Sequence, residues 1–455
     1  MVFRLFSGRN GIPPYWDRHD MKIAIIGGGI AGLAAAYDLA QDGNHTIHIY
    51  EAAPQVGGLA TGFRGRDTWD WPLERFYHHI FTNDDAIIKL TAEIGASHLL
   101  EIHRPITAMH YQGENYPFDT PLRLIQFPHL PLHIKLRMGA VLAFLKYWPN
   151  PPWRSYDRLL ADPWLARWMG DRGYRALWQP MLEGKFGSHF QDVNLAWFWA
   201  RIYKRTPQLG YYRGGFQGFV DALAEKVRER KVIIETQTPV EQIAPDPAGG
   251  FQVAVAERPS THYDAVLSTV SPRLMGKLTP AMPSQYLQQL AELRSMGAVV
   301  LTIALDRPLL TDGSYWVNVP KAEKLPFLAL VEHTNMVDPA HYAGDHLIYL
   351  GNYLDPAHPY FSMSQDELLA EFLPAITRFN PAFQPAWVTG AWLHKEAYAQ
   401  PVPVQGYADR IPDIRTPLPG LYFASMSQVY PWDRGTNYAV EMGRRVAEMI
   451  KRDWM

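Results

Sequence analysis

Three glycines near the start of the chain, Gly27, Gly29 and Gly32, have the spacing of a phosphate-binding turn. The first permits a tight turn, the second lets the backbone approach a pyrophosphate, and the third allows a helix to pack closely on a strand. A helix beginning here would present free N–H groups, at Ile30 and Ala31, and its positive dipole end to the phosphates. Glu51, nineteen residues after Gly32, is placed to accept hydrogen bonds from ribose hydroxyls. These residues predict a dinucleotide site.

The segments around these residues have the pattern needed to position them. Lys22–Ile26 is a short, isoleucine-rich run bounded by glycines, which is typical of a buried parallel strand. We expect an alanine- and leucine-rich helix over 33–40, and a second strand, Thr46–Tyr50, that leads to Glu51. A glycine-rich turn without a ligand is the alternative. However, strand, turn, helix, strand and acid occur in the order of a dinucleotide-binding βαβ unit.

A second glycine turn follows, since Gly57 and Gly58 come six and seven residues after Glu51. From here the chain resembles the superfamily of FAD-dependent amine oxidases, protoporphyrinogen oxidases and phytoene desaturases, in which such a turn helps to hold FAD. The resemblance continues through 398–401, 406–407, 420–424 and the helix from Asn437. It implies FAD as the cofactor. Because the chain has no cysteine for a thioether link, we expect FAD to be bound non-covalently.

Two positions depart from the superfamily pattern. Leu59 stands where many members have arginine, so phosphate neutralisation would rest on backbone N–H groups and the helix dipole. Ser425 and Met426 stand where many members have an acid, and Asp433 is expected to supply a ribityl contact instead. The resemblance also implies that the closing helix faces the pyrimidine edge of the flavin. The residues that it adds to the cofactor site are Gly57, Gly58, Leu59, Val240, Asp433, Asn437, Tyr438 and Ala439.

Two residues, His79 and Tyr398, are predicted to lie at the reacting side of the flavin. The segment 75–84 (RFYHHIFTND) is similar to a turn of UDP-galactopyranose mutases in which a histidine lies beside the flavin, and His79 is the matching position. A hydrogen-bonded histidine at a strand end is the alternative. Tyr398 is expected to join an aromatic wall over the flavin, with core packing as the alternative for each ring. The other rings of this wall are Trp392, Tyr407, Tyr430 and Trp432.

Two further stretches, 207–280 and 405–455, continue the α/β pattern. Between the first βαβ unit and these two stretches lie different regions: 84–206 is helix-leaning and rich in tryptophan, and 295–355 alternates like antiparallel sheet. We therefore predict an α/β fold with a discontinuous, Rossmann-like FAD-binding domain and an inserted α+β substrate domain. The FAD-binding domain is expected to comprise 21–83, 207–280 and 405–455, the substrate domain 84–206 and 281–404, and a flexible extension residues 1–20.

The composition excludes several other classes of protein. Among 455 residues, 43 Lys and Arg nearly balance 45 Asp and Glu, so no strong positive field is available for nucleic acid. Without cysteine there are no thiolate ligands, and Pro131 interrupts the histidine pair His129 and His133, so we expect no metal site. No apolar run is long enough to span a bilayer and no secretory signal is visible. We therefore expect a cytoplasmic protein with a small-molecule substrate; the sequence specifies no oligomeric state.

One segment, residues 122–148, could contact a membrane surface without crossing it. It combines bulky apolar side chains with cations and prolines, which favours short helices lying in a bilayer interface. The alternative is an amphipathic helix whose apolar face packs on the rest of the substrate domain. The cations and prolines are Arg123, Lys135, Arg137, Lys146, Pro128 and Pro131.

The chemistry implied by the resemblance is oxidation and reduction at a flavin. We predict an FAD-dependent oxidoreductase that dehydrogenates an organic substrate by hydride transfer and passes the electrons to oxygen or a quinone. The alternative is a non-redox, reduced-flavin mutase that acts on a nucleotide sugar. Such a mutase needs cations for two phosphates. Arg201, Lys204 and Arg205 could supply them, unless they form only a solvated helix face.

Overall fold

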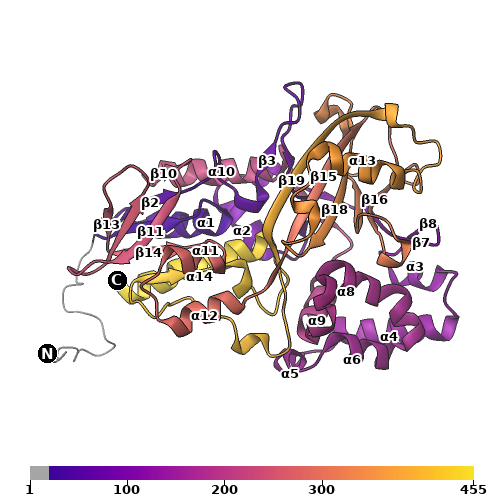
Figure 1. Cartoon of the computed structure of the whole chain (residues 1–455), viewed down its shortest axis with the longest axis horizontal. Coiled ribbons are helices and arrows are strands. Elements are labelled where there is room, and N and C mark those ends of the chain that lie inside the picture. Colours follow the sequence, from indigo (N-terminus) through magenta and orange to yellow (C-terminus); the bar gives the residue numbers. More distant parts are fainter. Residues whose placement is uncertain (1–19, 455) are drawn as a thin grey trace.

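The computed structural model describes residues 20–454, so all but the last residue of the predicted extension at 1–20 lies outside the described part. The molecule is elongated (Figure 1). A parallel sheet with its helices occupies one end, and a largely antiparallel sheet, in which only the strands Ile106–Tyr111 and Ser314–Asn318 pair in parallel, occupies the other with a cluster of helices. Segments from the beginning, middle and end of the sequence meet in the parallel sheet.

A five-stranded parallel sheet forms the centre of the first end. Its order is β10 (Ile233–Glu235), β2 (Thr46–Tyr50), β1 (Lys22–Ile26), β14 (Ala265–Ser268) and β20 (Leu421–Phe423). All neighbours pair in parallel, and β1 at the centre is almost wholly buried, as its apolar sequence requires. The α/β fold is therefore confirmed, while the domain boundaries stay predictions.

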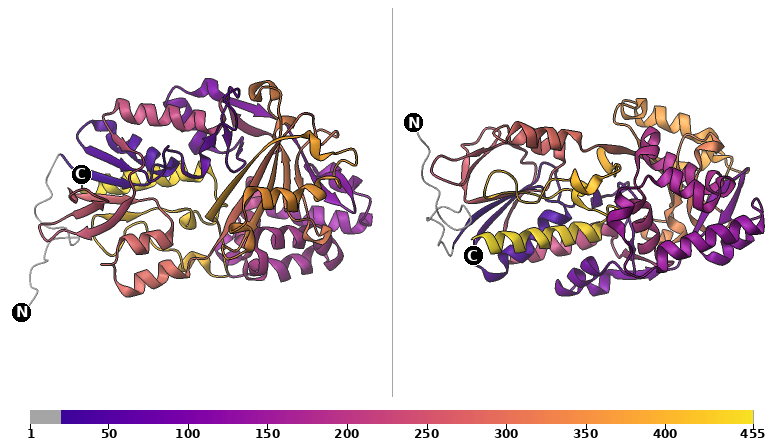
Figure 2. Two further views of the ribbon diagram at one scale, coloured as in Figure 1. Left: turned by 45° about the horizontal axis from the view of Figure 1, so that its top comes forward. Right: turned by 90° about the horizontal axis from the view of Figure 1, so that it is seen from below.

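Three helices pack on this sheet: α1 (Ile30–Leu39), α10 (Gly215–Glu229) and α14 (Thr436–Trp454). Helices α1 and α14 approach most closely at Gly443, where an added Cβ would lie only 2.3 Å from the backbone oxygen of Ala31. A glycine at this position therefore lets the two helices touch through their backbones. Figure 2 shows α14 running lengthwise from the middle of the molecule to the end that carries the parallel sheet.

Several smaller elements surround the parallel sheet. The turn at Gly249 and Gly250 joins two antiparallel strands. These strands and a third are β11 (Val240–Pro245), β12 (Phe251–Val255) and β13 (Thr261–Tyr263), followed by α11 (Pro272–Leu278) and α12 (Ser284–Glu292). The remaining short elements are β3 (Gly62–Phe63), β4 (Leu73–Glu74), β5 (Ile80–Phe81), α2 (Asp85–Glu93), β6 (Leu100–His103) and β9 (Leu209–Tyr212).

A seven-stranded sheet forms the second end. Its order is β19 (Val388–Pro401), β15 (Ser295–Leu305), β18 (His346–Leu354), β17 (Ala329–Glu332), β16 (Ser314–Asn318), β7 (Ile106–Tyr111) and β8 (Glu114–Pro117). The antiparallel pairing of β15 with β18 confirms the prediction for 295–355. Strand β19 was not predicted as a strand of this length, because most of it is only half-buried and lacks a clear alternation. Helix α13 (Gln365–Ile376) packs against this sheet.

A cluster of helices completes the second end and confirms the helical prediction for most of 84–206. Pro128 and Pro131 separate the first two helices, as expected. The helices are α3 (Pro121–Gln126), α4 (Leu132–Tyr147), α5 (Trp153–Asp157), α6 (Ala161–Met169), α7 (Asp171–Gly173), α8 (Gln179–Phe186) and α9 (Leu195–Lys204). Their shared core is rich in aromatic rings, which accounts for the tryptophans of this region.

A buried carboxyl group, Glu74, lies between β4 and α10. It accepts hydrogen bonds from the hydroxyl of Tyr211 (2.9 Å) and the backbone N–H of Phe216 (2.6 Å). Burial raises the pKa of Glu74 from 4.5 to about 7, although these two hydrogen bonds partly offset the effect. The folded protein therefore binds a proton at Glu74 more tightly than the unfolded chain does.

We expect this proton to make the stability of the protein depend on pH. As the pH rises from about 4.5 to about 7, the raised pKa of Glu74 should lower the free energy of unfolding by roughly 3 kcal/mol. Glu74→Gln imitates the protonated acid, so melting curves of this variant should decline less over the same window. Glu332, whose pKa burial also raises to about 7, keeps its own contribution in both proteins. Identical pH profiles for the two proteins would refute this role of Glu74.

Candidate functional site

The fold brings the two predicted glycine turns into contact. Gly29 and Gly57 form an isolated parallel β-bridge, and the N–H of Gly57 donates to the carbonyl of Gly28 (2.9 Å). Gly57 has a φ of +129°, and Gly58 begins a short 3₁₀ turn that includes the half-buried Leu59. Only the parallel sheet, by fixing the ends of β1 and β2, holds these turns side by side.

The start of α1 has the properties of a phosphate site. Gly29 precedes the helix without a side-chain cap, and the first turn has no acid. The N–H groups of Ile30, Ala31 and Gly32 precede the first intrahelical donor, Leu33, which bonds to Gly29 at 3.0 Å. The unpaired N–H groups and the helix dipole are therefore available to an anion such as a pyrophosphate.

The three glycines of the fingerprint have different surroundings. A Cβ on Gly32 would lie 2.1 Å from the backbone oxygen of Gly27, so Gly32 is needed for packing. The φ of Gly27, +109°, lies in the region that favours glycine. A Cβ on Gly29 would meet only the Cα of Gly58, at 3.8 Å. The space over Gly29 is open, as the approach of a pyrophosphate requires, so this cradle fits FAD.

Glu51 lies at the end of β2, beside the first glycine turn. Its carboxylate accepts hydrogen bonds from the N–H groups of Gly28 (2.7 Å) and Ala53 (2.8 Å). Its backbone oxygen accepts from Thr238 (2.9 Å), which places the start of β11, with the half-buried Val240, beside the same turn. Glu51 thus orients the glycine turn and retains lone pairs for ribose hydroxyls.

We expect Glu51→Gln to weaken FAD binding by roughly 1.5 to 3 kcal/mol, the range for hydrogen bonds to a charged group. Glutamine keeps the shape and one acceptor oxygen, so the glycine turn should persist. Titration of the apoprotein with FAD, followed by flavin fluorescence, measures the change. Glu93→Gln on the surface of α2 serves as the control. An unchanged dissociation constant in Glu51→Gln would exclude Glu51 from the ribose site.

At the start of α14, Tyr438 and Ala439, two of the three residues predicted to face the flavin, do not have free N–H groups. The N–H groups of Tyr438 and Ala439 both donate to the carbonyl of Gly435, at 3.1 Å. The side chain of Asn437 accepts from Ala86 (2.9 Å) and Ile87 (3.1 Å) and thereby caps α2. Among the described residues, the first N–H groups of α14 without a backbone acceptor are those of Thr436 and Asn437. The donors at this helix end therefore lie one to two residues earlier than predicted.

His79 lies in a largely apolar setting. Its ring packs on Phe81 (5.7 Å) and Trp316 (5.9 Å), and its buried Nδ1 has no hydrogen-bond partner within residues 20–454. Burial, together with the charges of Arg205 and Arg201, lowers the pKa of His79 to about 3. The imidazole is therefore neutral. The structure differs from the alternative of a hydrogen-bonded histidine at a strand end, because Nδ1 has no partner among residues 20–454.

The predicted aromatic wall is only partly assembled. Trp392 packs on Phe63 (5.8 Å) and Trp69 (5.0 Å), while Trp432 packs on Trp199, Tyr203 and Tyr438. The hydroxyls of Tyr398 and Tyr407 both bond to Ser427, at 2.7 Å and 3.0 Å, and Tyr407 packs on Tyr430. Burial raises the pKa of Tyr398. Tyr398 therefore stays protonated and cannot serve as a general base at neutral pH.

Asp433 occupies the centre of a largely buried charged cluster. Its carboxylate accepts from Lys185 (2.9 Å), Arg201 (2.9 Å), Trp197 (3.0 Å) and Gln400 (3.3 Å). These donors and its neighbour's backbone N–H use its lone pairs, so the predicted ribityl contact is not available to Asp433. The three cations around it hold its pKa well below the usual range.

The cluster has more positive than negative charge. Lys185, Arg201 and Arg434 surround the single carboxylate of Asp433, and Arg434 itself bonds to Gln400 (2.9 Å) and the hydroxyl of Tyr353. Burial, followed by the neighbouring Arg201, lowers the pKa of Lys185 to about 7. Arg205, which follows α9, is an exposed residue whose charge lies near those of Arg201 and Asp119.

Sequence reasoning missed Lys185 and Arg434. Lys185 lies in α8 with no motif around it, and no local signal indicates its partner almost 250 residues later. Arg434 follows Asp433 directly, and this adjacent pair of opposite charges was the only available signal. The prediction that 201–205 could be a solvated helix face is wrong for Arg201, whose guanidinium is bonded to Asp433.

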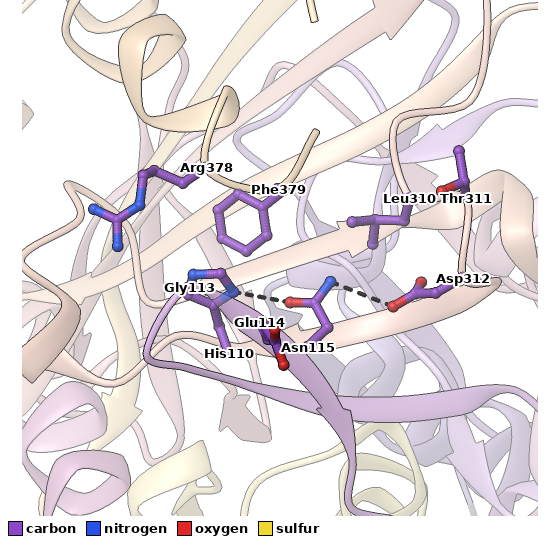
Figure 3. Close-up of a pocket in the computed structure, with 9 residues that line it drawn as sticks. All are labelled: His110, Gly113, Glu114, Asn115, Leu310, Thr311, Asp312, Arg378 and Phe379. Carbon is purple, nitrogen blue, oxygen red and sulfur yellow. Dashed lines mark hydrogen bonds between the residues drawn. The ribbon is translucent and has the colours of Figure 1, made fainter. Parts of the chain in front are cut away.

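A separate recess of about 320 Å³ lies on the antiparallel sheet (Figure 3). It is lined by β7 and β8, the loop after β15 and the end of α13, and none of its residues belongs to the glycine turns. Its polar groups bond to one another: His110 to Asn115 (2.9 Å), and Asn115 to Asp312 (3.4 Å). The recess is therefore distinct from the cofactor cradle. No group of metal-ligating side chains occurs within residues 20–454.

Known proteins share this architecture. A carotenoid phi-ring synthase from Streptomyces griseus is 22% identical, over 88% of this chain and 82% of its own. A solved structure assigned as a protoporphyrinogen oxidase, from Exiguobacterium sp. 255-15, has a TM-score of 0.75 and 19% identity, covering 95% of this chain and 99% of that chain. Reduced UDP-galactopyranose mutase has a TM-score of 0.71 and 16% identity, covering 95% and 96%. At such identities the solved structures show a common fold alone.

A family pattern covers nearly all of the sequence. The pattern describes flavin-containing amine oxidoreductases and matches residues 30–451, from the start of α1 to the last turns of α14. It therefore includes the second glycine turn, the seven-stranded sheet, all of the parallel sheet except β1, and the charged cluster. The chain belongs to the family of flavin-containing amine oxidoreductases and is an FAD-dependent oxidoreductase.

Proposed function

We propose that the protein oxidises an organic substrate that carries an anionic group, by hydride transfer to non-covalently bound FAD. Electrons would then pass to oxygen or a quinone. The observation that supports an anionic substrate is the excess of positive charge around Asp433, to which the exposed Arg205 adds near Arg201. Arg201 and Arg205 act electrostatically on His79, the residue that we assign to the reacting side of the flavin.

The same charges disfavour a protonated amine as substrate. Two like charges about 4 Å apart repel by roughly 1 kcal/mol in water and by about 4 kcal/mol near a protein surface. Several cations in one partly buried cluster multiply this repulsion, whereas a carboxylate or phosphate would relieve the repulsion among them. The charge of the cluster therefore separates this protein from oxidases that act on amines.

The remaining site residues bind and orient. The N–H groups at the start of α1 and the carboxylate of Glu51 would hold the pyrophosphate and ribose. The N–H groups of Thr436 and Asn437 lie at the positive end of α14, where they would stabilise negative charge. The neutral ring of His79 would donate or accept one hydrogen bond. When bound, FAD supplies a two-electron hydride acceptor.

Anaerobic bleaching of the flavin tests this proposal. The substrate panel comprises a porphyrinogen with free carboxylates, its methyl ester, a primary amine, a carotene and a nucleotide sugar. We expect bleaching by the free acid and at least roughly tenfold slower bleaching by its ester, since each lost charge contact is worth about 1.5 to 3 kcal/mol. Equal rates for acid and ester, or bleaching by the amine or carotene alone, would contradict an anionic substrate. Release of FAD on acid precipitation would support non-covalent binding.

A reduced-flavin mutase acting on a nucleotide sugar is the second candidate. The observation that favours it is the same cationic cluster, which has enough charge to neutralise a diphosphate. A mutase would work only after chemical prereduction and would interconvert sugar isomers without net electron flow. Product formed by dithionite-reduced enzyme, but not by oxidised enzyme, would therefore favour the mutase. Stoichiometric bleaching by a substrate would favour the oxidoreductase.

A further inference from the structure

Helix α4 has an outer face that is apolar and exposed. At about 100° per residue, positions 132, 136, 140, 143, 144 and 147 fall within about 120° of the helix circumference. They are Leu132, Leu136, Ala140, Ala143, Phe144 and Tyr147, all exposed, and Tyr147 is 74% exposed; the exposed His133 is the polar side chain in the same arc. The opposite side packs into the core through Met138 and Leu145. Helix α4 therefore has two apolar sides, and only one of them is buried by packing against the rest of the protein.

The two lysines of α4 do not lie on this outer face, in contrast to the amphipathic pattern predicted for 122–148. Lys135 is buried, and its ammonium group donates to the carbonyls of Ile125 and Phe127, at the end of α3. Lys146 donates to carbonyls at the end of α9, including that of Arg205 (2.7 Å). Both lysines form hydrogen bonds to neighbouring helices, so they do not add charge to the outer face of α4.

Neighbouring elements extend the exposed apolar surface. Leu122 and Ile125 of α3 are exposed, as are Trp148 after α4 and Trp168 of α6. Trp168 lies against α4, because its carbonyl accepts from Arg137 (2.7 Å). Of the thirteen large apolar side chains exposed within residues 20–454, seven lie in 122–148. In Figure 1, α3 and α4 lie at the end of the molecule away from the parallel sheet.

The charges around this surface are mostly positive. No Asp or Glu occurs between residues 120 and 156, whereas Arg123, Arg137 and Arg154 are exposed there. A recess of about 260 Å³ borders the surface, lined by Arg123, Asp119 and Arg104, the last two of which pair at 3.3 Å. Asp171, which follows α6, pairs with Arg175 at 2.9 Å. Exposed tryptophan and tyrosine beside arginines, with few acids, are the composition of segments that lie in the interface of an anionic bilayer.

We propose that this surface, made of the outer face of α4 with Leu122, Ile125, Trp148 and Trp168, docks the protein on an anionic lipid bilayer. A second copy of the chain fits less well. A twofold dimer would bring the surface against itself and place arginine against arginine with few acids to pair them. No helix within 20–454 is long and apolar enough to cross a bilayer, so contact is with the bilayer surface. Lys146 ties α4 to α9, so docking also brings Arg201 near the membrane.

Vesicle flotation of the FAD-loaded protein tests this proposal. We expect flotation with vesicles of phosphatidylcholine and phosphatidylglycerol, and much less with phosphatidylcholine alone. Leu136→Ser combined with Tyr147→Ser should lower the bound fraction about tenfold, because apolar area is lost. Arg123→Glu combined with Arg154→Glu should lower binding to the anionic vesicles alone. All four side chains are exposed and outside the flavin site, so flavin content and melting temperature should not change.

Helix α11 provides matched controls. Leu274 is an exposed leucine and Arg273 an exposed arginine, on an element that carries no comparable apolar surface. Leu274→Ser and Arg273→Glu should float like the wild type. The proposal is overturned if the wild type does not float with anionic vesicles at low salt, or if the α11 variants lose as much binding. It is also overturned if Leu136→Ser with Tyr147→Ser floats normally but converts a dimer to a monomer in sedimentation.

Discussion

Replacing Gly29 with valine is expected to give a folded protein without flavin. In the structure, a Cβ at Gly29 meets only the Cα of Gly58, at 3.8 Å, and the φ of Gly29 is an ordinary −71°. The chain itself therefore accepts a side chain here. A pyrophosphate at the start of α1 does not, because the added methyl groups occupy the space through which it must approach the N–H groups.

The yellow colour of the purified protein measures this effect. We expect flavin content below roughly a tenth of the wild-type value, which corresponds to at least about 1.4 kcal/mol of lost affinity. Gly139→Val in α4 is the control, since a Cβ there also meets nothing within 4 Å. The control should keep its flavin, and both variants should keep their circular dichroism. A Gly29→Val variant that retains full flavin would refute the fingerprint assignment.

Replacing Asp433 with asparagine is expected to lower the free energy of unfolding by about 3 to 5 kcal/mol, the range for removing one partner of a buried ion pair. Between residues 20 and 454, this carboxylate is the only acid within hydrogen-bonding distance of Lys185 and Arg201, whose side chains are 11% and 29% exposed. Without it, these cations repel one another at short range. The pKa of Lys185, which burial already lowers to about 7, should fall further.

Urea denaturation of the wild type and variant measures the loss. Asp409→Asn is the control, because Asp409 pairs with Arg158 on the surface, where ion pairs contribute little. Inorganic pyrophosphate should restore stability to Asp433→Asn more than to the wild type, since an added anion replaces the missing charge. If Asp433→Asn lowers the free energy of unfolding no more than the control does, Asp433 is not needed to offset the repulsion among the cations of the cluster. The charge argument for an anionic substrate would then fail with it.

The residues of the cofactor cradle were readable in the sequence. From Lys22 to Gly58 the chain shows strand, glycine turn, helix, strand, acid and second glycine turn in one continuous stretch. These signals are local, because each glycine is needed for a turn or a close backbone contact that involves residues near it in the sequence. For this reason the strands Lys22–Ile26 and Thr46–Tyr50 were predicted with their observed bounds.

The packing of the aromatic side chains could not be predicted from local signals of this kind. We expected a common aromatic wall over the flavin, made of Trp392, Tyr398, Tyr407, Tyr430 and Trp432. In the structure, Trp392 of β19 packs against one hydrophobic core, whereas Tyr430 and Trp432, in the loop before α14, pack against another. A ring buries apolar area equally well in either core, so residue type alone does not assign it.

The sequence by itself predicted a dinucleotide site on a parallel α/β sheet, and the resemblance of its motifs to a known superfamily implied that the dinucleotide is FAD. Only the tertiary structure decided what lies around the cofactor site and on the outer surface. Asp433 gathers Lys185 and Arg201 from helices more than 230 residues earlier in the chain. The outward side of α4 is likewise set by which of its two apolar sides packs on α6 and α9. Periodicity gives the faces of a helix, but only the neighbours that fold against it determine which face is buried.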